Sequence, residues 1–164
     1  MSDRDMEQIY KDYAQMVYRY LRSLTYDSEL AEELTQETFY RAVHSIHRFD
    51  GSSKLSTWLC QIAKHTWLKE LEKRKKRSTK ELDDQIPAPA SLEDSLVFSD
   101  EKTRLYRAIH KLEEPMKEVV LLRLTGELSF SEIGDVMNRN EGWARTTFYR
   151  AKKKLMEVLK DANL

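Results

Sequence analysis

The sequence predicts an all-α protein of two small helical domains that an acidic, proline-containing linker joins, the C-terminal domain being a helix-turn-helix. Apolar residues recur at helical spacing through most of the 164 residues, and no stretch shows the sustained period-two alternation typical of strands. Two of the three prolines lie in a serine-rich acidic stretch near the middle. Two short helical patterns follow each other across a tight turn near the end. We therefore expect a first domain at 1–78, a linker at 79–100 and a second domain at 101–164.

Three helices are predicted in the first domain, at about 5–24, 28–48 and 55–77. Asp27 or Ser28 caps the second helix, because short oxygen-bearing side chains accept the unpaired backbone N–H groups at a helix start. The inward stripes repeat every three or four residues. They comprise Ile9, Tyr13, Val17, Tyr20, Leu21 and Leu24, then Leu30, Leu34, Phe39, Ala42, Val43 and Ile46, then Leu55, Leu59, Ile62 and Ala63.

Charge is unevenly distributed, although 28 Lys and Arg balance 28 Asp and Glu. Residues 1–40 carry nine acidic and four basic side chains, whereas residues 69–80 carry two acidic and seven basic ones. Residues 81–101 hold seven acidic side chains and no basic one, and residues 139–160 hold two acidic and seven basic. Because phosphate binding depends on the local patch, the two basic segments favour a nucleic-acid partner and the acidic helix favours a different one.

The stretch from Ser78 to about Ser99 departs from the helical pattern and is predicted to be the linker, extended around Pro87-Ala88-Pro89. Two interpretations stay open. In one, this stretch is a flexible tether. In the other, its negative charge mimics nucleic acid and lies in a basic channel of a large partner.

Four helices are predicted in the second domain, at about 101–112, 116–125, 130–137 and 141–160. Pro115 suits the first turn of the second of these helices, because proline has no N–H to leave unpaired. The inward residues comprise Leu105, Ala108, Ile109 and Leu112, then Val119, Val120, Leu122 and Leu124, then Trp143, Ala144, Phe148, Ala151, Leu155 and Leu159.

The last two of these helices have the signature of a helix-turn-helix. Ser129 or Ser131 caps the first of them, and Glu132 follows Ser129 at the spacing of a capping box. Asn138-Arg139-Asn140 supplies the tight turn, since Asn tolerates left-handed backbone angles, and Gly134 suits a close approach. The outward residues of the last helix comprise Arg145, Thr146, Tyr149 and Arg150, followed by Lys152, Lys153 and Lys154. Such a helix fits the major groove, where Arg reads guanine edges and Lys contacts phosphates.

Several other classes of protein lack support in the sequence. Cys60 is the single cysteine, so we expect a small core residue rather than a disulfide or a cysteine metal cluster. His44 and His47 form a weak metal-like pair that we interpret as ordinary surface or partly buried histidines. Neither a glycine-rich phosphate loop nor a nucleophile elbow is present. We expect no catalytic residue, metal, cofactor or small-molecule substrate.

The N-terminal residues are polar and acidic, without the apolar centre of a signal peptide, and no apolar run is long enough to cross a bilayer. With its single cysteine, the chain is therefore expected in a reducing, cytoplasmic setting.

The two halves together resemble the extracytoplasmic-function (ECF) sigma factors, the smallest members of the sigma-70 family of bacterial transcription initiation factors. The resemblance covers nearly the whole chain. Its most specific parts are AEELTQETFYRAV at 31–43, FDGSSKLSTWLCQIAKHT at 49–66 and LSFSEIGDVMNRNEGWARTTFYRAKKKL at 128–155. Each motif alone is weak, whereas their order around an acidic linker is specific.

The resemblance implies roles for individual positions. The family's acidic helix docks on the beta-prime clamp helices of RNA polymerase, which the spacing E-x-x-Q-E assigns here to Glu33, Gln36 and Glu37. The family's loop and following helix capture the melted minus-ten strand, with matching positions Phe49, Asp50, Ser52, Ser53, Lys54, Trp58, Gln61 and His65, and Lys64 and Lys69 beside them. The family's helix-turn-helix contacts the minus-thirty-five element, with matching positions Arg145, Thr146, Tyr149, Arg150 and Lys153. For Trp58, a purely structural role stays equally open.

The implied partners are core RNA polymerase, through its beta-prime clamp helices and beta flap, and promoter DNA. The family also implies an anti-sigma factor, commonly membrane-anchored, which would tether the cytoplasmic chain at the membrane.

Three departures from the family pattern limit this transfer. His65 stands where the family usually has Asn, which leaves the minus-ten base preference open. The usual Thr-Val-Lys-Ser-Arg run is replaced by residues 143–147, where Arg145 and Thr146 keep the expected chemistry and Thr147 loses a positive charge. The helix after Trp67 lacks the family's Asp and Arg, so their pairing is not transferred.

Two other function classes stay open at this point. One is a self-sufficient helix-turn-helix repressor or activator whose N-terminal domain dimerises or senses a ligand. The other is a helical protein-interaction adaptor, which would leave the basic clusters without a role. A sigma factor is expected to shift promoter DNA only together with core polymerase, whereas a repressor would shift DNA alone.

Overall fold

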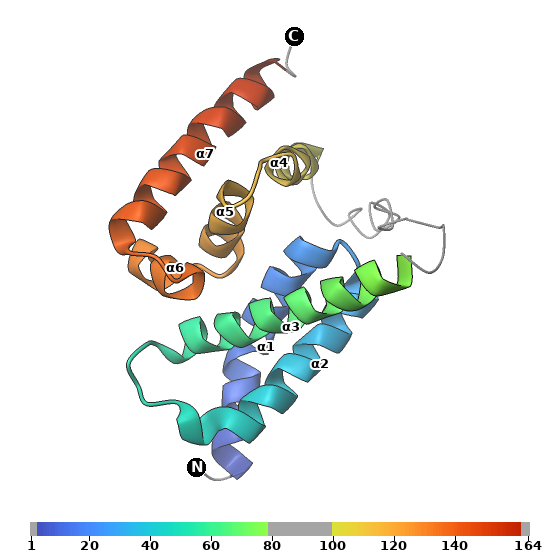
Figure 1. Cartoon of the computed structure of the whole chain (residues 1–164), viewed down its shortest axis with the longest axis vertical. Helices are drawn as coiled ribbons and strands as arrows, with labels where there is room; N and C mark the ends of the chain where they lie inside the picture. The colour runs from blue at the N-terminus through green and yellow to red at the C-terminus, as the bar shows by residue number, and fades with distance from the viewer. Residues whose placement is uncertain (1–2, 79–99, 162–164) are drawn as a thin grey trace. The chain divides into compact units, whose positions relative to one another are not determined.

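The computed structural model of the chain describes residues 3–78 and 100–161. The chain divides into two compact units, Met1–Leu92 and Glu93–Leu164, which we describe separately. Within the described residues every regular element is a helix (Figure 1), which confirms the predicted all-α class with two small domains. The predicted linker lies outside the described residues except for its last position, and the limits predicted for it stay predictions.

The first unit is a three-helix assembly. It contains α1 (Asp3–Thr25), α2 (Ser28–Ser45), the short 3-10 helix η1 (Ile46–Arg48) and α3 (Leu55–Ser78). Each of the three long helices packs against the other two (Figure 1). The residues at the centre have no exposed surface, and they are Val17, Tyr20, Leu21, Ala31, Ala42, Leu59, Cys60 and Ala63. The predicted core position of Cys60 is therefore confirmed.

The ends of α2 settle one open alternative and correct one prediction. Asp27, rather than Ser28, is the N-cap, and its carboxylate accepts a hydrogen bond from the Leu30 backbone N–H at 3.1 Å. The α-helix was predicted to reach Arg48, but it ends at Ser45 and tightens into η1. The Phe49 N–H then bonds the Ile46 carbonyl, which satisfies one of the carbonyls that a helix end leaves unpaired.

Val43 is the other correction in this unit. It was predicted to be inward, but it is 47% exposed, because it lies at the edge of the stripe that Phe39 and Ala42 bury. Two threonines inside the core, Thr35 and Thr38, satisfy their hydroxyls by donating to the carbonyls of Ala31 and Leu34.

The second unit surrounds one long helix. It contains α4 (Asp100–His110), α5 (Met116–Thr125), α6 (Phe130–Met137) and α7 (Glu141–Asp161). α7 packs against the other three helices (Figure 1). The residues at the centre have no exposed surface, and they are Ile109, Val119, Leu121, Leu122, Ile133, Ala144 and Ala151.

Helix α5 differs from the prediction in one residue at its outer end. Leu124 was predicted to be buried but is 44% exposed, whereas Leu121, which the prediction omitted, is fully buried. The helix buries four consecutive residues, 119–122, because α4, α6 and α7 contact it from different sides. A single helical stripe therefore describes α5 poorly.

The predicted helix-turn-helix geometry is confirmed in detail. Ser129 caps α6, and its hydroxyl accepts from the Glu132 N–H while the Glu132 carboxylate accepts from the Ser129 N–H, which completes the capping box. Asn138 adopts the left-handed conformation, with φ 57°. A Cβ on Gly134 would lie 2.6 Å from the Arg139 carbonyl oxygen, so only glycine lets the turn fold back this closely.

Candidate functional site

The acidic face of α2 presents two of the three predicted polymerase-binding residues to solvent. Glu33 and Gln36 are exposed and lie three residues apart on one side of the helix. Glu37 is only half-exposed, because its carboxylate accepts a hydrogen bond from the Arg41 Nε at 2.9 Å. The three side chains therefore lie together on one helix, but Glu37 is also held by an intrahelical ion pair.

Tyr40 lies on the same exposed side and was not singled out from the sequence. It is 62% exposed, one turn after Gln36, and its ring meets that of His44 edge to face at 4.4 Å. The available sequence signal was the spacing, because Tyr40 follows Gln36 by four residues and Gln36 follows Glu33 by three. The face of α2 thus combines carboxylate and amide groups with an exposed Tyr ring, and Tyr is enriched at protein interfaces.

The loop between η1 and α3 is organised by Asp50. Its carboxylate accepts a hydrogen bond from the Ser52 backbone N–H at 2.9 Å, and Gly51 between them has φ +78°. Hydrogen bonds from the Ser52 side chain and backbone lower the pKa of the Asp50 carboxyl below its ordinary value. The loop therefore turns around an ionised, solvent-exposed carboxylate, with the predicted residues Ser52 and Lys54 exposed and Ser53 half-buried.

Phe49 and Trp58 bring the loop and α3 together. Their ring centroids lie 5.2 Å apart at an interplanar angle of 43°, and both residues are half-buried. The Trp58 N–H bonds the Lys54 carbonyl, which continues the first turn of α3 toward the loop. Trp58 thus has a structural contact and also keeps exposed surface, so the geometry is compatible with both roles considered for it.

Other minus-ten candidates lie before and after Trp58 on the same side of α3. Lys54, Trp58, Gln61 and His65 are separated by four, three and four residues, which places them on one side of a helix. Trp58 and Gln61 are half-buried, while Lys54 and His65 are exposed. The structure therefore brings an amide, an imidazole and an ammonium group into one line beside the loop.

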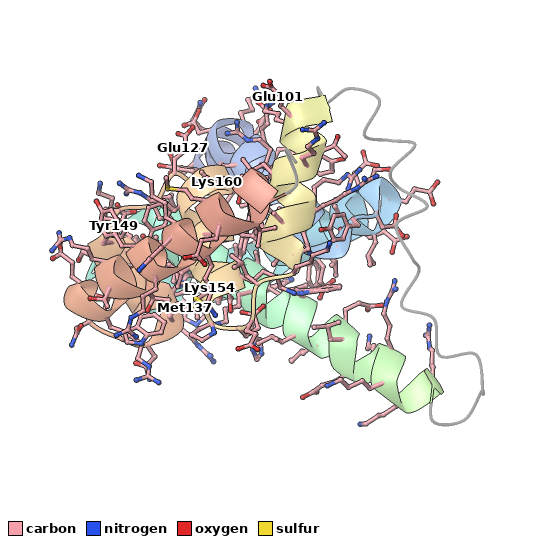
Figure 2. All side chains as sticks on the ribbon, turned by 90° about the horizontal axis from the view of Figure 1, so that it is seen from above. Glu101, Glu127, Met137, Tyr149, Lys154 and Lys160 are labelled. Carbon is pink, nitrogen blue, oxygen red and sulfur yellow. The ribbon has the colours of Figure 1, made fainter. Side chains whose placement is uncertain are left out.

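The C-terminal part of α3 is strongly basic. Lys75, Lys76 and Arg77 lie in its last turn, where positive charge is favoured by the helix dipole. Figure 2 shows nitrogen-tipped side chains standing out from this end of the helix. The line of minus-ten candidates thus leads into a cationic helix end.

The predicted minus-thirty-five residues lie on the exposed face of α7. Arg145, Thr146, Tyr149, Arg150 and Lys153 are all exposed. The helix starts from a firm cap, because the Asn140 side chain accepts from the Trp143 N–H at 2.7 Å. Tyr149 lies along α7 before Lys154 and Lys160, and nitrogen-tipped side chains stand out along this helix (Figure 2). All five candidates therefore share one face of the second helix of the helix-turn-helix.

An aromatic cluster supports that face and was not predicted. The Phe130 ring, at the start of α6, lies 5.5 Å from Phe148 and 6.1 Å from Tyr149. The Arg123 guanidinium lies 4.3 Å from the Phe130 ring centroid and donates to the Leu128 carbonyl at 2.8 Å. The cluster thus ties α5, α6 and α7 together behind the exposed residues. The sequence signal was weak, because these residues lie far apart along the chain.

Arg145 is held on two sides. Its Nη2 donates to the Glu141 carboxylate at 2.9 Å, and its guanidinium lies 5.5 Å from the Phe130 ring centroid. About half of each charged side chain remains exposed, 54% for Arg145 and 53% for Glu141. The sequence analysis placed Arg145 on the outward side of this helix and predicted neither of these two contacts.

Two features are absent from the part of the chain that the structure describes. Within residues 3–78 and 100–161, no group of three His, Cys, Asp or Glu side chains is gathered in a way that would hold a metal ion. Over the same residues, no helix combines the length and apolar character that a membrane crossing requires.

These features define a two-part helical protein with an acidic face on α2, an aromatic pair beside the loop after η1 and a cationic helix-turn-helix, the organisation of a transcription factor. The family described as Sigma-70 region 2 matches residues 9–77, and that described as Sigma-70, region 4 matches residues 102–155. The ECF RNA polymerase sigma factor SigM of Bacillus subtilis (strain 168) is 35% identical over 155 residues, covering 92% of each chain. The chain therefore belongs to the ECF sigma factors of the sigma-70 family, which are transcription initiation factors.

Further similarities agree with this assignment. The ECF RNA polymerase sigma factor SigW of the same organism is 31% identical over 171 residues, covering 96% of this chain and 88% of that protein. The fold is similar to that of the sigma factor RpoE from Bartonella quintana, solved with the anti-sigma factor NepR, with a TM-score of 0.79 at 21% identity. That match covers 96% of this chain and 98% of the other.

Proposed function

We propose that the chain is an alternative sigma factor that binds bacterial core RNA polymerase, directs it to specific promoters and helps to melt the minus-ten region. The observation that carries this proposal is the pairing of two surfaces in the first unit. An acidic face on α2 suits a protein partner, and the Phe49–Trp58 pair suits unstacked bases. A promoter-specificity subunit needs both surfaces.

Polymerase binding is assigned to Glu33, Gln36 and Glu37, with Tyr40 added from its exposure. These side chains face the beta-prime clamp helices in our proposal. Exposed carboxylates steer association with a basic partner, and an exposed aromatic ring supplies the apolar contact that interface centres favour.

Capture of the opened strand is assigned to the loop and the exposed line of α3. Bases stack on Phe49 and Trp58, which supply ~1–3 kcal/mol for each stacked base. Gln61 and His65 hydrogen-bond base edges or backbone. The remaining contacts come from the loop residues Asp50, Ser52, Ser53 and Lys54, in which the ionised Asp50 fixes the turn.

Upstream duplex recognition is assigned to α7 of the second unit. Arg145 and Arg150 read base edges in the major groove, Thr146 and Tyr149 contact bases or phosphates, and Lys153 contacts phosphate. The limits of the two functional domains in this proposal are residues 1–78 and 101–164, with the acidic linker between them.

The chain performs no catalysis of its own in this proposal, because RNA synthesis belongs to the polymerase. We place it in the cytoplasm with the polymerase and the chromosome. An anti-sigma factor is the inhibitory partner, and this is supported by the structurally similar sigma factor RpoE, which was solved in complex with the anti-sigma factor NepR. The inhibitor would cover the polymerase-binding and DNA-binding faces.

Mobility-shift and initiation assays test the proposal together. The purified chain is mixed with labelled genomic fragments, with and without core polymerase. We expect DNA shifts and specific initiation only when both proteins are present. Tight, sequence-specific binding by the chain alone would identify a self-sufficient repressor or activator instead.

A further inference from the structure

The Glu141–Arg145 pair has a geometry that matters for reading DNA. One guanidinium nitrogen, Nη2, donates to the Glu141 carboxylate at 2.9 Å. An arginine has five N–H donors in a planar fork, and a bidentate contact with guanine O6 and N7 uses only two of them. The carboxylate contact therefore leaves enough donors for a base edge while it restricts the orientation of the fork.

Neighbouring residues fix both members of the pair. Glu141 is the first residue of α7, directly after the Asn140 cap that bonds the Trp143 N–H. On the other side, the Arg145 guanidinium lies over Phe130, and Arg123 lies over the same ring at 4.3 Å. The Arg145 side chain thus lies between the Glu141 carboxylate and the Phe130 ring, although about half of it is exposed.

We propose that Glu141 is a positioning residue for Arg145 and that it sets how strongly this chain discriminates between promoter sequences. The proposal rests on the duplex-reading role assigned to α7 above. The carboxylate aims the arginine fork at a base edge. It also neutralises part of the charge that would otherwise bind phosphates, which every DNA sequence presents equally. Both effects favour sequence-dependent contacts over sequence-independent ones.

A simpler role for Glu141, as a negative charge alone, predicts a different binding result. If Glu141 acted only as a negative charge near DNA, its removal would tighten binding to all sequences by the same factor, with or without Arg145. If it acts through Arg145, its removal lowers base discrimination only while Arg145 is present. The two cases are separated by a double-mutant comparison.

The experiment uses the full chain with bacterial core polymerase and a promoter-fragment library randomised across the minus-thirty-five element. Bound fragments are sequenced for the wild type, Glu141→Gln, Arg145→Ala, the double variant and Glu157→Gln. Glu157 is an exposed acid later on α7, so Glu157→Gln is a control with the same change of charge. Unfolding midpoints of all variants establish that α7 is intact.

We expect Arg145→Ala to abolish the preference at one base position. Glu141→Gln should lower that preference by about two- to fivefold, the range set by an exposed ion pair, and should tighten binding to random fragments. The double variant should select like Arg145→Ala, and Glu157→Gln like the wild type. An undiminished preference in Glu141→Gln, or an equal change in both Arg145 backgrounds, would overturn the proposal. A wild-type complex that selects no sequence at all would instead refute the proposed function, and this inference with it.

Discussion

The ring centroids of Phe49 and Trp58 lie 5.2 Å apart, and the pair joins the loop after η1 to the first turn of α3. Both residues are half-buried, so each ring contacts the protein on one side and keeps some exposed surface. The same pair can therefore hold the loop and offer a surface for an unstacked base.

Replacing Trp58 by Ala should impair promoter opening more than folding. The loss of the Phe49 contact should reduce the free energy of unfolding by ~0.5–1.5 kcal/mol beyond the loss of buried area, and each lost base stack should weaken the open complex by ~1–3 kcal/mol. Permanganate reactivity of minus-ten thymines in the reconstituted complex measures opening. Trp58→Phe keeps an aromatic ring and should retain most of the promoter opening. Normal opening by Trp58→Ala would leave this residue a structural role only.

Reversing charge on the acidic face of α2 should weaken binding to core polymerase. Glu33→Lys combined with Gln36→Lys is preferable to a change at Glu37, because a lysine there would face Arg41 one turn away and disturb α2 itself. Like charges across an interface cost several kcal/mol, so the Kd should rise at least about tenfold.

Fluorescence anisotropy of the labelled chain, titrated with core enzyme, measures that Kd. Glu157→Lys, a charge reversal on the second unit, is the control for added positive charge and should bind as the wild type does. Equal affinity of all three proteins would remove the polymerase contact from this face.

Truncating the α7 arginines should reduce promoter use. Arg145→Ala and Arg150→Ala should each cost ~1–3 kcal/mol if the side chain makes a bidentate base contact, and each should relax preference at one position. Lys153→Ala should instead weaken binding to all sequences. It should also lower the slope of log binding constant against log salt concentration by about one. Initiation rates at several salt concentrations distinguish these classes. Unchanged initiation in both arginine variants would contradict the assignment of α7.

Gly134 is the residue of the helix-turn-helix that should tolerate substitution least. An added Cβ would lie 2.6 Å from the Arg139 carbonyl oxygen and 3.0 Å from backbone atoms of Asn140, so Gly134→Ala should destabilise the unit by ~1–3 kcal/mol. Gly142→Ala is the control, because its nearest neighbour atom lies at 3.5 Å and alanine is the better helix former. Thermal unfolding of both variants checks this. A Gly134→Ala protein as stable as Gly142→Ala would contradict the close approach.

The order of the Asp50 loop should depend on pH. Because the pKa of Asp50 is lowered in the folded chain by its bonds to Ser52, the ionised form stabilises the loop above the unfolded pKa. This contribution is lost as the pH falls through the lower, folded pKa. The Ser52 amide resonance, followed by NMR, should titrate with a midpoint below the ordinary Asp value of about 3.9. A midpoint at or above that value would show that the bond does not favour the carboxylate.

Much of the local structure could be predicted because it depends on neighbouring residues. The capping box of Ser129 and Glu132, the left-handed Asn138 and the small Gly134 are all short-range signals, and all three are confirmed. Leu124 could not be placed correctly, because the buried side of α5 is decided by three helices from elsewhere in the chain.

In the candidate site, too, contacts within one helix could be predicted and contacts between helices could not. Helical spacing was enough to align Trp58, Gln61 and His65, because they belong to one helix. The contact of Arg145 with Phe130 joins α7 to α6, and sequence spacing carries no signal for such a pair. Contacts between elements were therefore the part that the structure had to supply.

Run-off transcription with purified bacterial core polymerase, followed by mapping of start sites on genomic DNA, decides whether the chain confers promoter specificity. We expect the chain and core enzyme together to initiate at a set of sites with shared upstream sequence, and neither protein to do so alone. Initiation no more specific than that of core polymerase alone would contradict that expectation.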